Sequence, residues 1–156
     1  MIRVLFLCLG NICRSPLAEA AFRAHVEARG HTDRFVIDSA ATSGHHAGEP
    51  PNPGSIRVAR AHGLDISAQR SRKLVAADLR QFDFIVPMDR SNQRALIDLP
   101  AHRRPLVREF DPECLGTLDV PDPWGGGPEG FEEVWAILVR SVPGLLEHIQ
   151  HNGKQV

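Results

Sequence analysis

Short apolar runs alternate along the chain with stretches in which apolar residues recur every three or four positions. The runs are rich in branched side chains and have the length of buried strands. They are residues 2–7, 35–37, 84–86 and 105–107. Because strands that alternate with helices pair in parallel, the pattern predicts an α/β fold with a parallel sheet.

Four other stretches have the marks of helices. They are residues 15–30, 52–63, about 89–99 and 131–149. In the first, Ser15 suits the N-cap, Pro16 suits the first helical position and Gly30 ends the helix. In the last, Pro143 interrupts the periodic pattern and is expected to kink the helix.

Two of the connecting segments are candidate functional loops. Residues 111–130 hold many Gly and Pro, and a loop of that length inside a compact domain is usually functional. Residues 8–15 follow the first strand directly. In parallel sheets ligands bind beyond the carboxyl ends of the strands, so the second loop lies where a ligand is expected.

The residues from Cys8 to Ser15 combine a nucleophile with a site for an anion. Gly10 and Asn11 tolerate left-handed backbone geometry, so the loop can curl and turn successive N–H groups inward. Arg14 adds a full positive charge, and the start of the next helix adds a partial one. These groups stabilise a thiolate, so Cys8 should ionise easily. A cysteine at a strand end is more often a packing residue, but its setting here favours a catalyst.

Composition and charge narrow the possible classes of protein. The chain has 156 residues, which fits one domain, with 42% hydrophobic and 24% charged residues. A formal charge of -1 argues against a domain built to bind nucleic acid or an anionic membrane. No apolar run is long enough for a transmembrane helix, and the run at 2–7 is too short for a secretion signal. Three cysteines argue against a disulfide framework, so we expect a cytoplasmic protein.

The loop and three further motifs resemble one known family. The segment CLGNICRSP at 8–16 is similar to the phosphate loop of the low-molecular-weight protein tyrosine phosphatases. The chain also has, in the family's order, DSAATSG at 38–44, MDRSN at 88–92 and DPWG at 122–125. The resemblance implies one domain over residues 1–156, with a flavodoxin-like four-stranded parallel sheet and helices on both faces. It also implies hydrolysis of phosphomonoesters without a metal or cofactor.

The resemblance assigns a role to each part of the cleft. Cys8 attacks phosphorus and carries a cysteinyl-phosphate intermediate, while Arg14 holds the phosphate oxygens and stabilises their charge. Asp122 is the general acid and then the general base. The residues expected to bind substrate are Leu9, Gly10, Asn11, Ile12, Cys13, Ser15, His45 and Trp124.

The resemblance also assigns supporting roles around Cys8. Ser15 is expected to hydrogen-bond the Cys8 sulfur, and Asn11 is expected to fix the loop in its left-handed shape, with Ser43 among its supports. Cys13 is expected to capture an oxidised Cys8 as a disulfide and so protect it. The alternative for Cys13 is that it is a small packing residue.

The chain departs from the family at the cleft wall. His45 stands where most relatives have Trp or Tyr, which leaves Trp124 to supply a flat apolar surface. The chain has no Tyr at all, so regulation by phosphorylation of cleft tyrosines cannot occur here. Its histidines and cysteines lack the spacing of a metal site.

Three other functions stay open. Protein arginine phosphatases carry Thr at the position of Ile12, and a polar Thr suits a guanidino leaving group better than Ile does. Arsenate reductases of this fold need extra cysteines just after the third strand, where this chain has Pro87, Met88 and Asp89. An intact catalytic set argues against a module that only binds phosphotyrosine. We expect a phosphotyrosine protein as substrate, phosphate or another oxyanion in the loop, and a monomer.

Overall fold

The computed structural model describes residues 1–153 and alternates strands with helices as the sequence predicts. The strands are β1 (Ile2–Cys8), β2 (Phe35–Ala41) and β3 (Phe84–Pro87). The α-helices are α1 (Arg14–Ala28), α2 (Pro53–Ala61), α3 (Ala76–Gln81), α4 (Arg90–Gln93) and α5 (Pro128–Asn152). Short 3-10 turns are η1 (Thr32–Arg34), η2 (Arg94–Leu96), η3 (Ala101–Arg103) and η4 (Val107–Phe110).

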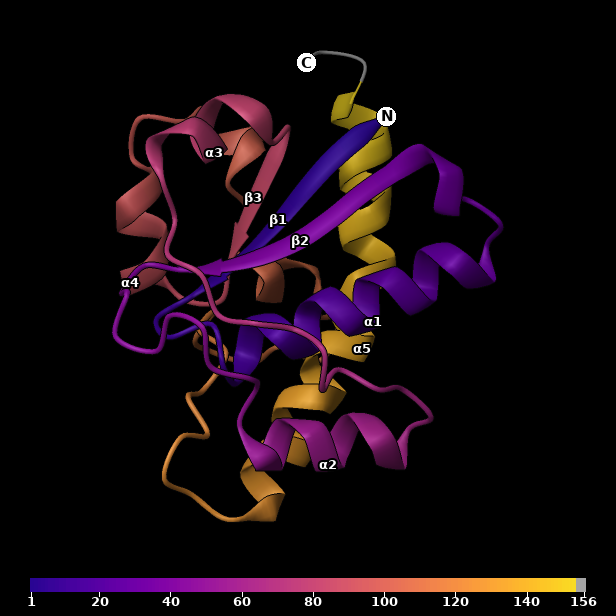
Figure 1. Cartoon of the computed structure of the whole chain (residues 1–156). Coiled ribbons are helices and arrows are strands. Elements are labelled where there is room, and N and C mark those ends of the chain that lie inside the picture. The colour runs from indigo at the N-terminus through magenta and orange to yellow at the C-terminus, as the bar shows by residue number, and fades with distance from the viewer. Residues whose placement is uncertain (154–156) are drawn as a thin grey trace.

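The strands form one parallel sheet in the order β2-β1-β3 (Figure 1). β1 is therefore central and pairs along its whole length with β2, from Ile2 opposite Phe35 to Cys8 opposite Ala41. Only its middle residues pair with β3, from Val4 opposite Phe84 onward. This arrangement places Cys8 at the carboxyl end of the central strand, where parallel sheets bind their ligands.

Alternate residues of β1 serve two separate cores, one on each face of the sheet. Val4 and Phe6 are fully buried in the larger core, which α1, α2 and α5 complete. Leu5 and Leu7 face the smaller core with Phe82, Ile85 and Leu96 from the α3, β3 and η2 region. Figure 1 shows α1 and α5 on one side of the sheet and α3 and α4 on the other. The predicted α/β fold with helices on both faces is confirmed.

The prediction of a fourth strand at residues 105–107 is wrong. Among residues 1–153 the sheet has three strands, and the chain here enters η4 instead. The run contains only three residues, and Pro105 has no N–H to give to a ladder. Val107 is buried in the larger core because η4 packs against α5, and Leu106 is buried without belonging to the sheet.

The helix boundaries differ from the predicted ones at several points. α1 begins at Arg14 with Cys13 at its N-cap, so Ser15 is not the cap. The helix predicted over 89–99 is a short α4 followed by η2, and α3 was not predicted. The predicted helix after Asn52 is confirmed, since the Asn52 side chain caps it at the Gly54 N–H (2.8 Å). α5 starts three residues before the predicted Phe131 and runs unbroken through Pro143.

Within residues 1–153, no helix has both the length and the apolar character needed to cross a bilayer.

Candidate active site

The loop between β1 and α1 forms the floor of a pocket of about 350 Å³. Because β1 alternates, Cys8 points to the same face as Val4 and Phe6, toward the start of α1. Residues from two other parts of the chain, 43–46 and 122–124, complete the walls. The lining residues are Cys8, Leu9, Gly10, Ile12, Cys13, Arg14, Ser43, His45, His46, Asp122 and Trp124.

The carbonyl groups of the loop point away from the pocket, into the surrounding chain. The Leu9 carbonyl accepts from the Ser43 N–H (3.0 Å), and the Gly10 carbonyl accepts from the Ser71 hydroxyl (2.9 Å). In a trans peptide the N–H points opposite to the carbonyl, so each outward carbonyl leaves the next N–H facing the pocket.

The carbonyl groups at the end of the loop also point away from the pocket. The Ile12 carbonyl accepts from the Asn52 N–H (2.8 Å), and the Cys13 carbonyl accepts from the buried Ser55 hydroxyl (3.0 Å). The inward N–H groups that result form a nest for an anion at the start of α1. The sequence predicted this nest from Gly10 and Asn11, and Asn11 does adopt the left-handed conformation (φ 54°).

A chain of hydrogen bonds leaves the Ser15 hydroxyl hydrogen free to point at the Cys8 sulfur. The Asn11 amide is oriented by the Arg72 N–H, which donates to its oxygen (3.1 Å), so the amide nitrogen must donate elsewhere. It donates to the Ser15 hydroxyl oxygen (2.7 Å) and to the Ser39 hydroxyl oxygen (3.0 Å). The Ser15 hydrogen is then free to point at the Cys8 sulfur, 3.0 Å away. The Asn11 backbone N–H donates to the same sulfur (3.2 Å), so two hydrogen-bond donors face Cys8.

The sequence did not single out the outer members of this chain. The Ser39 hydroxyl donates to the Glu19 carboxylate (2.8 Å), which also accepts from Arg23 (2.8 Å). Burial raises the pKa of the Glu19 carboxyl, while the bonds from Ser39 and Arg23 oppose that rise. The family resemblance predicts Ser43 as a support of Asn11, but Ser39 is the serine that bonds the Asn11 amide. Ser43 supports the loop differently, through its backbone bond to Leu9.

Arg14 is a buried cation held on one side of the pocket. Its guanidinium donates to the Asp89 carboxylate (2.7 Å) and to the Val120 carbonyl (3.0 Å). Burial works against its charge, but Cys8, Asp89 and Asp122 outweigh burial and raise the Arg14 pKa. The guanidinium therefore stays charged and in a fixed orientation beside the thiol.

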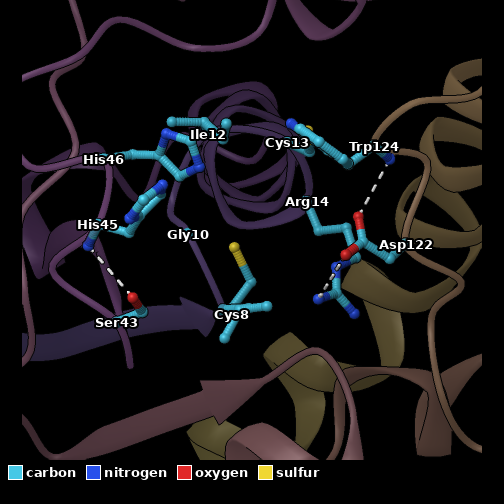
Figure 2. A pocket seen from close by; sticks show the side chains of 11 residues that line it. Cys8, Gly10, Ile12, Cys13, Arg14, Ser43, His45, His46, Asp122 and Trp124 are labelled. Atoms are coloured by element: carbon cyan, nitrogen blue, oxygen red, sulfur yellow. Dashed lines mark hydrogen bonds and ion pairs between the residues drawn. The ribbon is translucent and has the colours of Figure 1, made fainter.

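Asp122 reaches the pocket from the opposite end of the sequence. Its carboxylate lies 3.8 Å from the Arg14 guanidinium and is 47% exposed. It accepts a hydrogen bond from the Trp124 N–H (3.1 Å), an Asx turn that sets its direction. Figure 2 shows Asp122 and Arg14 on one side of Cys8, with His45 and His46 on the other. The arrangement can hold an oxyanion over a thiolate, with a carboxyl group within reach of a leaving atom.

A sequence profile described as "Low molecular weight phosphotyrosine protein phosphatase" matches residues 3–155. The chain belongs to this family.

Its relatives span almost the full chain. A "Low molecular weight protein-tyrosine-phosphatase" from Streptomyces coelicolor is 40% identical over 154 residues, which cover 95% of this chain and 93% of the relative. The crystal structure of a protein tyrosine phosphatase from Entamoeba histolytica has a TM-score of 0.90 at 33% identity and covers 99% of both chains. The structure of a Drosophila arginine phosphatase has a TM-score of 0.82 at 28% identity, covering 96% of this chain and 98% of its own.

The wall opposite Arg14 is built from two histidine rings in this member of the family. The rings of His45 and His46 meet edge to face with centroids 4.9 Å apart. The His46 Nδ1–H donates to the Glu49 carboxylate (2.6 Å), and the His46 ring lies beside Gly10 of the loop. A Cβ at Gly10 would come within 3.0 Å of the His46 ring, so a larger residue there would require the ring to shift by a few tenths of an ångström. His46 belongs to no motif that marks it as a site residue, so the sequence does not identify it.

Cys13 lies at the start of α1 and lines the same pocket as Cys8. Its side chain is buried, and its pKa is raised to about 12 by burial first and then by the negative charges of Asp122 and Cys8. Cys13 is therefore a protonated thiol near neutral pH. Cys8, Cys13 and Cys114 are all free cysteines. Within residues 1–153 there is no cluster of three or more His, Cys, Asp or Glu side chains placed to hold a metal ion.

Proposed function

We propose that this protein hydrolyses phosphotyrosine in protein substrates through a cysteinyl-phosphate intermediate. The observation that carries the proposal is the Cys8 sulfur, which accepts from Ser15 and from the Asn11 N–H at the floor of an anion nest. A sulfur that accepts two hydrogen bonds beside a buried arginine is stabilised as the nucleophilic thiolate. Membership of the phosphatase family supports the same reaction.

In the first step the Cys8 thiolate attacks phosphorus, and the bond from phosphorus to the tyrosyl oxygen breaks. The Asp122 carboxyl gives its proton to that oxygen, so tyrosine leaves as a neutral phenol. The three remaining phosphate oxygens are held by the loop N–H groups and by Arg14, where charge builds up in the transition state.

In the second step water attacks the phosphocysteine, and the Asp122 carboxylate takes a proton from the water. The sulfur–phosphorus bond breaks, and Cys8 returns as a thiolate that the Ser15 hydroxyl stabilises. Phosphate then leaves the loop. Cys8 and Asp122 thus act in both steps, and the cycle ends with the enzyme in its starting protonation state.

The pocket walls favour an aromatic leaving group. Leu9 and Trp124 are 53% and 64% exposed at the rim, and Ile12 presents an apolar side chain inside it. A phenol ring is stabilised by such surfaces, whereas a guanidino group would lose its hydrogen bonds to water there. For arsenate reduction, a thiol relay would need a reactive cysteine beyond the phosphate loop. Cys114, which lies outside that loop, donates to the Thr117 carbonyl (3.1 Å) and does not line the pocket.

The test is an assay of the purified protein on peptides that carry phosphotyrosine, phosphoserine or phosphoarginine, and on arsenate with a thiol reductant. We expect phosphate release from phosphotyrosine to exceed release from the other peptides by at least about 10²-fold, because a pocket built for one leaving group rejects the others strongly. Trapping a phosphate-labelled protein at Cys8 during turnover would establish the intermediate. Faster release from phosphoarginine, or arsenate reduction at a comparable rate, would overturn the proposal.

We also propose that the protein works as a monomer in a reducing cytoplasm. All of the groups in the pocket come from one chain, and Cys8 acts only as a reduced thiol. Light scattering on the purified protein and fractionation of the source cells test these two points.

A further inference from the structure

We propose that Arg108 is a positioning residue that holds Asp122 in register with the nucleophile. The inference rests on the proposed function, in which Asp122 is the proton donor. Arg108 lies outside the residues that line the pocket, so its effect on the reaction must pass through the segment 111–127, here called the acid loop.

The acid loop is tied to the body of the protein just before Asp122. The Val120 N–H donates to the Met88 carbonyl (2.9 Å) at the end of β3. The side chain of Asp119 accepts from the Arg90 N–H (2.9 Å) at the start of α4. These bonds fix the two residues from which the chain turns toward the pocket.

Arg108 supplies a further tie, and it comes from a different element. Its guanidinium donates to the backbone carbonyl of Asp119 (2.8 Å), only three residues before Asp122. The Arg108 side chain is 15% exposed and also lies 3.7 Å from the buried Asp111 carboxylate. A hydrogen bond from a largely buried charged donor is among the stronger ones, so it restrains this carbonyl.

The element that carries Arg108 is packed firmly against the rest of the protein. Arg108 lies in η4, whose Val107 is fully buried and whose Phe110 packs on α5 at Gly144. A Cβ at Gly144 would come within 3.0 Å of Phe110, so η4 and α5 are in close contact. Arg108 therefore connects the acid loop to the long helix α5, which is anchored in the larger core.

Beyond these ties, the other restraints near Asp122 are the Arg14 bond to the Val120 carbonyl (3.0 Å), the 3.8 Å approach of Arg14 to the Asp122 carboxylate, and the Asx turn. The chain on the far side of Asp122 is open. Asp122 and Trp124 are exposed, and the three residues that follow are all glycine. A general acid must lie within hydrogen-bond reach of the leaving oxygen, and a displacement of about 1 Å can cost about 10²-fold in rate. Loss of the Arg108 contact should therefore act on proton donation, not on phosphate binding.

Arg140 provides a matched control for Arg108. It lies on α5 and also binds Asp111, through two hydrogen bonds of 2.9 and 3.0 Å, and it approaches Glu113 at 3.3 Å. Both arginines thus pair with the same carboxylate, but only Arg108 also donates to the Asp119 carbonyl. Variants of the two separate a general loss of stability from a loss of position.

The experiment measures kcat/KM for a series of aryl phosphates whose leaving phenols differ in pKa, using Arg108→Met, Arg108→Lys and Arg140→Met. For Arg108→Met we expect a loss of about tenfold with the poorest leaving groups and almost none with the best, because a good leaving group needs little protonation. Arg108→Lys should lose less, with the same trend. Arg140→Met should lower the melting temperature without this trend.

A second arm places Arg108→Met in an Asp122→Asn background. If Arg108 acts through Asp122, the added change should cost nothing more there, because the proton donor is already absent. Equal losses across all leaving groups, or a further tenfold loss in the double variant, would overturn the role of Arg108. If Arg108→Met does not fold, Arg108→Lys carries both arms. An inactive wild-type protein would instead contradict the proposed function, so the two failures can be told apart.

Discussion

The phosphate loop (residues 8–15) and the acid loop (residues 111–127) face the same pocket but are held in different ways. In the phosphate loop Asn11, Arg14 and Ser15 are buried, and its carbonyls are bonded by the surrounding chain. In the acid loop Asp122 and Trp124 are exposed, and the bonds that tie the loop to the protein lie a few residues upstream.

The difference in burial and restraint matches the chemical tasks of the two loops, which are to bind an oxyanion and to transfer a proton. An oxyanion site works best when its dipoles are fixed before the charge arrives, so the first loop is rigid and buried. A group that gives and takes a proton must meet both a leaving group and water, so the second loop stays open to solvent. Changes in the phosphate loop should therefore remove catalysis for every substrate, and changes in the acid loop should remove it selectively.

The first prediction concerns the nucleophile. Cys8→Ser should lower turnover by about 10⁴-fold or more for every leaving group, because the covalent route is lost. Phosphate or vanadate should still bind, since the inward N–H groups and Arg14 remain. The measurements are steady-state kinetics and isothermal titration with vanadate. Substantial turnover in this variant would exclude the covalent mechanism.

The second prediction concerns the acid loop and should give the opposite pattern. Asp122→Asn keeps the shape but cannot give a proton, and should lower kcat by about 10²–10⁴-fold on phosphotyrosine. The loss should shrink for activated aryl phosphates. Plotting rate against leaving-group pKa for wild type and variant tests this. Parallel lines would mean that Asp122 has only a structural role.

The two loops also differ in how far the sequence revealed them. The last residue of the strand, Cys8, the Gly-Asn pair and the Arg-Ser-Pro start of α1 lie within nine consecutive residues, so local rules predict the nest. The left-handed Asn11 follows from the same local pattern. Asp122 carries no such local signal, because a turn Asp before Pro is common, and only the family resemblance pointed to it.

The residues that the sequence did not identify act over long distances in the chain. Ser39 lies 28 residues from Asn11, and Arg72 lies 61 residues from it. No periodicity relates such positions, since only the register of β2 beside β1 brings Ser39 under the loop. The prediction of a fourth strand is wrong because a local pattern does not show which element covers a buried run. A short apolar run predicts burial, but burial against a helix and burial in a sheet give the same pattern.

The third prediction compares two serines that flank the phosphate loop. Ser39→Ala removes the hydroxyl between the Asn11 amide and Glu19, which leaves buried polar atoms without that partner and removes one of the three bonds that orient the Asn11 side chain. We expect kcat/KM to fall by about tenfold, the cost of about 1.4 kcal/mol, and iodoacetate to alkylate Cys8 more slowly. Ser43→Ala keeps its backbone bond to Leu9 and should cost less. A larger effect from Ser43 would show that the hydrogen-bond chain is not what prepares Cys8.

The fourth prediction concerns oxidation of the phosphate loop. Peroxide should convert Cys8 to a sulfenic acid, and Cys13 should then displace water to form a disulfide that dithiothreitol reduces. Wild type should regain most of its activity, and Cys13→Ser should regain several-fold less. The pKa of Cys13, about 12, makes its thiolate scarce, so capture should speed up as pH rises from 7 to 9. Equal recovery in both proteins would leave Cys13 as a packing residue.

The last and smallest effect is expected at the wall opposite the acid loop. His45→Trp should place an indole where this protein has an imidazole, and a flat ring beside the substrate ring is worth about 0.5–1.5 kcal/mol beyond burial. That corresponds to a gain of about 2- to 12-fold in affinity for a phosphotyrosine peptide, which binding to the inactive Cys8→Ser protein can measure. Ile97→Trp is the matched control, because Ile97 is 74% exposed and lies outside the pocket. The gain should be confined to aryl phosphates and absent for inorganic phosphate, since the nest itself is unchanged. Weaker binding to the peptide would mean that the imidazole of His45 contributes a polar contact to the substrate, and that this wall recognises more than an aromatic ring.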